Sequence, residues 1–182
     1  FSGCMNPTPS SAIWLIASPR PSNPETIPPE QAPMPRKTIA LPSQFAFSSK
    51  YRVLYSDVNS ANHLGADRVL PIAMETQLQF INHLGYEDAT AFEDAGLIMA
   101  YSEVQYLAEA AYADELLVEL AVDNLLEKSF ELVYRISNLS RDCEMARVVT
   151  TLLFFDYQRK CVIPVPGSFL DRVGQAAKRP QY

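Results

Sequence analysis

Hydrophobic and polar residues alternate in several stretches of the chain, while one stretch instead shows a helical period. Alternation with a period of two predicts strands at residues 45–55, 97–106, 116–122, 130–136 and 146–157. Between the first two, apolar residues recur every three or four positions over residues 69–84, which predicts one long helix ending at Gly85. This order predicts an α+β fold in which a five- or six-stranded antiparallel sheet wraps one central helix.

The helix and the last long strand both lack a wide polar face. In the helix only Glu75, Gln79 and Asn82 form a narrow polar stripe, so the helix is expected to be largely enclosed. Residues 152–155 read Leu-Leu-Phe-Phe and are apolar on both faces of their strand. We therefore expect that strand at the centre of the sheet or at a subunit contact.

The first part of the chain differs in composition from the rest. Ten of the fourteen prolines lie within the first 42 residues, in a segment with no helical or strand period. We predict a Pro-rich extension at residues 1–40 without regular structure, one folded domain at 41–172 and a C-terminal tail at 173–182. Met34 would make a natural start for the folded part, so residues 1–33 are expected to be an added or upstream segment.

Composition excludes several classes of function. The net charge is −6, with no basic stripe and no glycine-rich phosphate loop, which argues against nucleic acid as a partner. The apolar run at residues 12–17 is too short to span a membrane. Three cysteines form no CxxC pair and the two histidines lack metal-ligand spacing, so we expect a reduced, cytoplasmic protein that needs neither metal nor cofactor.

Polar side chains gather where the first strand gives way to the helix. Within residues 55–65 lie Asp57, Asn59 and His63, side chains that move protons or polarise a carbonyl group. Each of them also has a structural interpretation, because Asp and Asn in loops commonly bond to nearby backbone and a single loop histidine is usually structural. The loop becomes a candidate functional site because of its position between the predicted first strand and the predicted helix.

Three segments together resemble the acyl-CoA thioesterases of the 4-hydroxybenzoyl-CoA thioesterase-like family, which have the hotdog fold. They are the loop at 56–65, the helical Met74-Glu75-Thr76 and the closing residues 155–166, and the resemblance covers roughly residues 41–170. It implies hydrolysis of a fatty or aryl acyl-CoA to free acid and CoA. It also implies a homodimer or homotetramer whose sheets join edge to edge, with the active site at the subunit interface.

The family loop commonly reads Asp-x-Asp-x-x-Gly-His-Val-Asn, and its second Asp acts on the thioester. Asp57 matches the first Asp and His63-Leu64 matches His-Val, while Asn59 stands where the acting carboxylate is expected. Asp57 and Glu75 are therefore alternative bases or nucleophiles, and Glu75 has an equally good interpretation as a solvated helix residue. Asn59 is expected to orient water or bond the thioester oxygen, and His63 to bond Asp57 or contact the acyl group.

Substrate contacts are predicted in two places. Backbone N–H groups of Leu64, Gly65 and Ala66, at the positive end of the helix dipole, are expected to stabilise the oxyanion. Arg159 and Lys160 have two interpretations, first as a polar turn and second as a contact for CoA phosphates.

Two other functions remain open. A hotdog hydratase resembles this loop through an Asp-x-Asn-Pro-x-His signature, but Ser60 replaces the Pro and His63 comes one residue late. A non-catalytic protein that binds acyl-CoA or an acyl carrier would retain the groove without the acting Asp, which is the situation that Asn59 represents.

Overall fold

The computed structural model describes residues 38–87 and 95–176, which contain one long helix, one short helix and six strands. In chain order these are β1 (Phe47–Arg52), the 3₁₀ turn η1 (Tyr55–Asp57), α1 (Ala66–His83), β2 (Gly96–Tyr106), β3 (Glu115–Asp123), β4 (Ser129–Asn138), β5 (Cys143–Asp156), β6 (Cys161–Ile163) and α2 (Gly167–Ala176).

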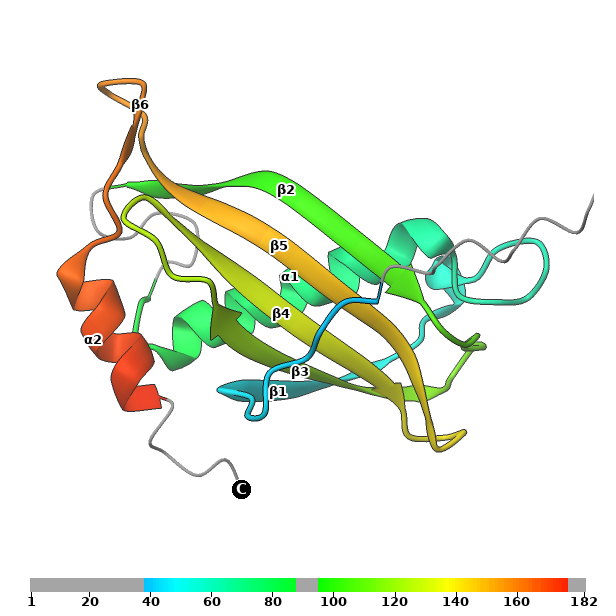
Figure 1. The fold of residues 1–182 in the computed structure, drawn as a ribbon. Helices are drawn as coiled ribbons and strands as arrows, with labels where there is room; N and C mark the ends of the chain where they lie inside the picture. Colours follow the sequence, from blue (N-terminus) through cyan, green and yellow to red (C-terminus); the bar gives the residue numbers. More distant parts are fainter. Residues whose placement is uncertain (1–37, 88–94, 177–182) are drawn as a thin grey trace, which may run out of the picture. The chain divides into compact units, whose positions relative to one another are not determined.

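The six strands form one antiparallel sheet with the order β1-β3-β4-β5-β2, and β6 pairs with the end of β5 (Figure 1). The predicted α+β architecture of one long helix and an antiparallel sheet is therefore confirmed. Strand β5 lies between β4 and β2, which explains why residues 152–155 are apolar on both faces. Among the described strands, β1 and β2 form the two edges of the sheet.

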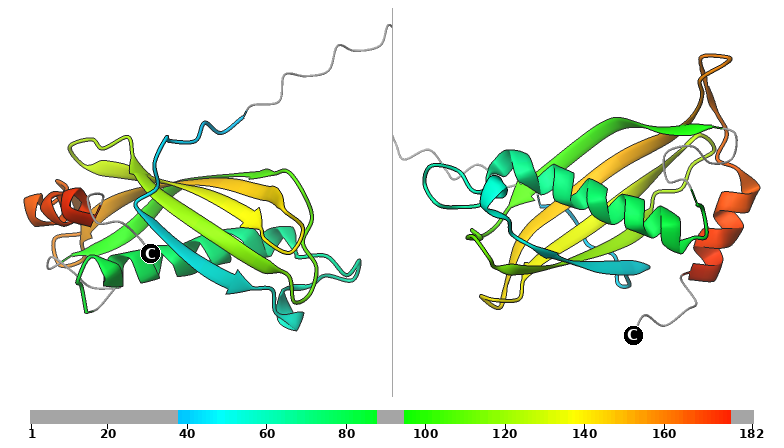
Figure 2. Two further views of the ribbon diagram at one scale, coloured as in Figure 1. Left: turned by 90° about the horizontal axis from the view of Figure 1, so that it is seen from below. Right: turned by 180° about the vertical axis from the view of Figure 1, so that it is seen from behind.

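Helix α1 lies along one face of the sheet, as the two views in Figure 2 show. Its buried apolar residues share one hydrophobic cluster with alternate residues of β3, β4 and β5. They are Val69, Ile72, Ala73, Phe80 and Ile81. The helix is less enclosed than predicted, since Met74 is 43% exposed. The sheet covers only one side of it.

Gly85 ends α1, as predicted, in the left-handed conformation with φ of 89°. The Gly85 N–H donates to the carbonyl of Asn82 (2.9 Å) and the Tyr86 N–H to that of Ile81 (3.4 Å). These two bonds form a Schellman motif and satisfy carbonyls that the helix leaves free. The other end of α1 lies earlier than predicted, at Ala66 instead of residue 69.

Residues 38–46 cross the opposite face of the sheet, in front of the strands in Figure 1. Ile39 donates its N–H to Oε1 of Gln105 and accepts a bond at its carbonyl from Arg147. The ring of Phe45 lies 4.7 Å from the guanidinium of Arg135. This segment therefore covers part of the second face of the sheet.

The first strand is shorter than the predicted 45–55. The chain leaves β1 after residue 52, and the Leu54 N–H donates to the carboxylate of Asp57 instead of to a neighbouring strand. That bond favours the 3₁₀ turn η1 over continued extension.

Two elements near the end of the chain were not predicted, the short strand β6 and helix α2. Residues 173–176, the start of the predicted C-terminal tail at 173–182, instead continue α2. Phe169 holds this helix in place, because its ring centroid lies 4.9 Å from that of Phe130 and 5.2 Å from that of Phe154. Residues 177–182 of the predicted tail and residues 1–37 of the predicted extension lie outside the described residues.

Candidate active site

Asp57 closes the turn that follows β1. Its Oδ2 accepts bonds from the Tyr51 hydroxyl (2.7 Å) and the Leu54 N–H (2.9 Å), and the residue is only 8% exposed. Arg68 of α1 lies 3.9 Å from the other oxygen. Burial and the bond to Asp57 raise the pKa of Tyr51 to about 12. These contacts give Asp57 a structural role in this chain.

Asn59 also bonds to its own loop. Its Oδ1 accepts the N–H groups of Ala61 (2.9 Å) and His63 (3.2 Å), and its own N–H donates to the His63 carbonyl (2.8 Å). This is the Asx-type local bonding that competes with a chemical role for such residues. Asn62 follows in the left-handed conformation, with φ of 65°. The loop therefore holds His63 in a fixed backbone position.

Of the three backbone amides expected to bind an oxyanion, two are already used. Leu64 donates its N–H to the Ala110 carbonyl and Gly65 to that of Asp57, both at 2.8 Å. Ala66 is the first residue of α1, and no acceptor among the described residues bonds its N–H. One predicted donor, at the positive end of the helix dipole, thus remains available.

A pocket of about 210 Å³ opens beside the start of α1, and we call it the helix-start pocket. Its polar side chains come from Asn59, His63, Tyr106 and Glu109. The remaining lining is Leu64, Ala66, Val69, Ala108, Ala110 and Met145. A mostly apolar wall with a few polar groups at one end is typical of a site for an acyl group.

The segment between β2 and β3 supplies one wall of this pocket. The N–H groups of Leu107 and Ala108 both donate to the carbonyl of Met145 in β5. At the far end of β2, the Tyr106 hydroxyl donates to the carbonyl of Ala66 (2.9 Å), which ties the strand to the first turn of α1.

Asp114 fixes the end of that segment. Burial alone would raise its pKa, but bonds from the Ala111 N–H, the Asn138 amide and the Arg141 guanidinium outweigh it and hold the pKa below the usual 3.8. All three donors reach Oδ2, at 2.9, 2.7 and 2.8 Å. These bonds therefore hold the end of the segment that carries Glu109 in place.

A second pocket, of about 370 Å³, lies on the β1 side of α1, and we call it the Asp57 pocket. It is lined by Tyr51, Asp57, Arg68, Pro71, Ile72, Glu75 and Gln79. Glu75 accepts a bond from Gln79, one turn further along the helix, at 2.9 Å and is itself exposed.

The structure therefore divides the four predicted catalytic side chains between two pockets. Asn59 and His63 line the helix-start pocket, whereas Asp57 and Glu75 line the Asp57 pocket. Glu109, which lies 3.4 Å from His63, was not among the predicted site residues. One signal was present, because Glu109 is a single acidic residue among alanines 108, 110 and 111.

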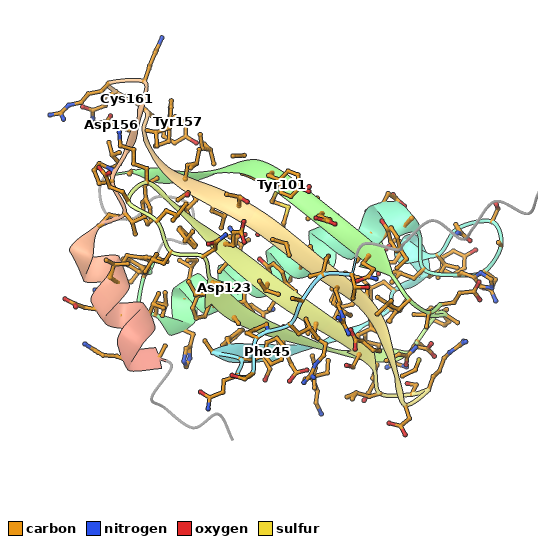
Figure 3. The ribbon with its side chains drawn as sticks, in the orientation of Figure 1. Phe45, Tyr101, Asp123, Asp156, Tyr157 and Cys161 are labelled. Atoms are coloured by element: carbon orange, nitrogen blue, oxygen red, sulfur yellow. The ribbon has the colours of Figure 1, made fainter. Side chains whose placement is uncertain are left out.

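Arg159 and Lys160 lie in the β5–β6 turn, where Asp156 accepts the N–H of Arg159 and lies 3.6 Å from its guanidinium. Lys160 has φ of 51°, as expected for a tight turn. Figure 3 labels Asp156, Tyr157 and Cys161 around this turn, at the end of the sheet opposite the start of α1. Within one chain, Arg159 and Lys160 therefore do not lie near the helix-start pocket.

No cluster of three or more His, Cys, Asp or Glu side chains in the described ranges has an arrangement that would hold a metal ion. Within the same ranges, no helix is both long enough and apolar enough to cross a membrane.

Comparison with known protein families shows to which family the chain belongs. A family model described as Thioesterase-like superfamily matches residues 53–173, more than half of the chain. The chain belongs to the Thioesterase-like superfamily. The match includes the loop, α1 and every later strand of the hotdog sheet, so the family resemblance seen in the loop and helix is confirmed. No curated protein sequence matches the chain significantly.

Solved thioesterases share the fold at low sequence identity. The 1,4-dihydroxy-2-naphthoyl-CoA thioesterase from Synechocystis has a TM-score of 0.63 and 18% identity over 70% of this chain and 95% of its own. A thioesterase from Thermus thermophilus, solved with coenzyme A and Zn, has a TM-score of 0.65 and 18% identity, and the match covers 75% of this chain and 98% of the thioesterase. A mutant 4-hydroxybenzoyl-CoA thioesterase with bound 4-hydroxybenzoyl-CoA has a TM-score of 0.64 and 17% identity, and the match covers 70% of this chain and 97% of the mutant. These likenesses show the hotdog fold.

Proposed function

We propose that this protein is an acyl-CoA thioesterase that hydrolyses a fatty or aryl acyl-CoA to the free acid and CoA. The observation that carries the proposal is the helix-start pocket, which joins an apolar wall to an unbonded helix amide in a chain of this superfamily. Three of the similar solved proteins act on, or were solved with, CoA or its thioesters.

The chemistry of the pocket suits a thioester. The carbonyl oxygen would lie at the Ala66 N–H, where the helix dipole favours the negative charge that develops in the transition state. The acyl group would lie against Leu64, Val69 and Met145. His63 stands at the polar end of the same pocket, within reach of a water molecule that attacks the carbonyl carbon.

We further propose a homodimer, or a tetramer of such dimers, in which β2 pairs with its copy. Strand β2 is an 11-residue edge strand, and long open edges favour pairing with another chain. Its last residue, Tyr106, lines the helix-start pocket, so a partner on this edge would lie beside the site. A second chain would also be needed to bring Arg159 or Lys160 to the CoA phosphates.

A cytoplasmic location is part of the proposal. Cys143 and Cys161, the cysteines in the described residues, are both free, which fits a reducing compartment.

A non-catalytic acyl-CoA binding protein is the second candidate. It is favoured by Asn59, whose side-chain oxygen is committed to the loop, and by the position of Asp57 and Glu75 in the other pocket. The hydratase is disfavoured, because its chemistry needs an Asp and a His together and here Asp57 and His63 line separate pockets.

A panel of short, medium and long-chain acyl-CoA and aryl-CoA thioesters tests the proposal. CoA and free acid should be separated by chromatography, because the exposed Cys161 would react with a thiol reagent. We expect turnover of at least one member well above the rate without protein. Binding of the thioesters by folded protein with no turnover would instead support the non-catalytic candidate.

A further inference from the structure

The helix-start pocket contains a carboxylate that comes from outside the loop. Glu109, in the segment between β2 and β3, lines the pocket together with His63 and Asn59. We propose that His63 is the general base of thioester hydrolysis and that Glu109 is the residue that positions it. This inference rests on the proposed thioesterase function.

The geometry of the two side chains fits these roles. Nδ1 of His63 lies 3.4 Å from Oε1 of Glu109. A carboxylate at Nδ1 favours the tautomer that carries its proton there, which leaves Nε2 as the nitrogen able to accept a proton. The same logic of a base held by a third group operates in hydrolases of unrelated folds.

Backbone hydrogen bonds keep the residues His63 and Glu109 close together. Leu64, the residue after His63, donates its N–H to the carbonyl of Ala110, the residue after Glu109, at 2.8 Å. His63 itself is fixed by two bonds with Asn59. Asn59 therefore supports the proposed base through its bonds to the His63 backbone. This gives the amide a function at the position where the family commonly has its carboxylate.

The other acidic side chains are less suitable. Asp57 is buried and its Oδ2 is committed to Tyr51 and Leu54, and Glu75 lines the Asp57 pocket. Either carboxylate would have to act away from the Ala66 amide. Glu109 is the one acidic side chain that lines the helix-start pocket in the described part of the chain.

The reaction balances without a cofactor. Nε2 of His63 takes a proton from water as the water oxygen forms a bond to the thioester carbon, and the carbonyl electron pair moves onto oxygen beside the Ala66 N–H. Collapse of this intermediate breaks the C–S bond and forms the carboxylic acid. The imidazolium then returns its proton to the thiolate of CoA, and Glu109 stabilises the imidazolium in between.

Few charges other than Glu109 bear on His63. From β2, Tyr106 lines the pocket and donates its hydroxyl to the Ala66 carbonyl. From the first turn of α1, Arg68 lies 3.9 Å from Asp57 and 4.0 Å from Asp67, outside this pocket. The His63 and Glu109 side chains are 44% and 66% exposed in the free protein, and a bound substrate would cover them and strengthen their interaction.

The test compares His63→Gln, Glu109→Gln and Glu109→Asp with Glu127→Gln, an exposed residue between β3 and β4 that serves as the matched control. We expect His63→Gln to lower kcat by at least about 100-fold. Glu109→Gln should lower kcat by roughly 10- to 100-fold with little change in KM, Glu109→Asp should recover part of the loss, and the control should match wild type.

The pH profile tests the role of His63 as the base. The activity of the wild type should rise with pH, because a general base accepts a proton only in its neutral form, and this rise should be absent in His63→Gln.

NMR gives a readout that does not depend on activity. The chain has only two histidines, so the ring signals of His63 are assigned by their loss in His63→Gln, and His83 is an internal reference. In the neutral ring of His63 the nitrogen chemical shifts should place the proton on Nδ1, and Glu109→Gln should weaken this preference while the ring signals of His83 stay unchanged. Unchanged kcat and unchanged ring nitrogen shifts of His63 in Glu109→Gln, with an active wild type, would overturn this inference alone. An inactive wild type would overturn the proposed function as well.

Discussion

The bonds around Asp57 make a quantitative prediction about its role. Asp57→Ala removes a buried carboxylate that accepts two hydrogen bonds and leaves the Tyr51 hydroxyl and the Leu54 N–H without their acceptor. At about 1.5–3 kcal/mol for each of the two bonds to a charged group, we expect a loss of about 3–6 kcal/mol in the free energy of unfolding. Tyr51→Phe, which removes one of the two bonds, should cost about 1.5–3 kcal/mol.

Urea unfolding of the two single variants and the double variant at pH 7 measures this effect and the coupling between the side chains. We expect a coupling of about 1–2 kcal/mol. Tyr55→Phe is the control, because Tyr55 is 83% exposed and should change stability by less than about 0.5 kcal/mol. The structural role would be refuted by a coupling near zero. It would also be refuted if Asp57→Asn lost turnover while keeping wild-type stability, since Asp57 would then act in the chemistry.

Three further predictions concern stability and use the same unfolding assay. Gly85→Ala should cost about 1 kcal/mol or more, because the left-handed φ disfavours a side chain and the new Cβ would meet Arg172 at 2.8 Å; wild-type stability would contradict this. Thr150→Val should cost less than about 1 kcal/mol, because the buried Thr150 hydroxyl lies near the buried Tyr134 hydroxyl without a hydrogen bond of normal geometry; a loss above about 2 kcal/mol would show that the two hydroxyls are well bonded. Asp114 has a lowered pKa, so it stabilises the fold above its unfolded value of 3.8 and this stabilisation is lost as the pH falls below that value. Asp114→Asn should therefore cost about 1–3 kcal/mol at pH 7 and less at pH 3, and an equal cost at both pH values would contradict the reasoning.

The regular elements were predictable because their periods follow directly from burial. The alternation in residues 130–136 placed Phe130, Leu132, Tyr134 and Ile136 on one face, and all four are buried in β4. Helix α2 could not be predicted in the same way. It is a short helix held by the packing of Phe169 against rings that are distant in sequence, and a local pattern contains no information about such contacts.

The candidate site was only partly predictable for a related reason. The spacing of Asp57, Asn59 and His63 identified the loop, but spacing in a loop does not determine which way each side chain faces. The structure turns Asp57 toward Tyr51 and β1, whereas His63 faces the segment between β2 and β3. Glu109 was missed because its nearness to His63 depends on the pairing of two loops 46 positions apart in the sequence.

Filling the helix-start pocket and measuring hydrolysis tests whether the substrate binds at the start of α1. Ala108 is exposed and lines the pocket, so Ala108→Trp should occupy it without disturbing the core, while Lys128→Trp adds the same side chain at an exposed position elsewhere. With the best acyl-CoA of the panel, we expect kcat/KM to fall at least about tenfold in Ala108→Trp and to stay unchanged in Lys128→Trp. Wild-type hydrolysis by folded Ala108→Trp would contradict the placement of the active site at the start of α1.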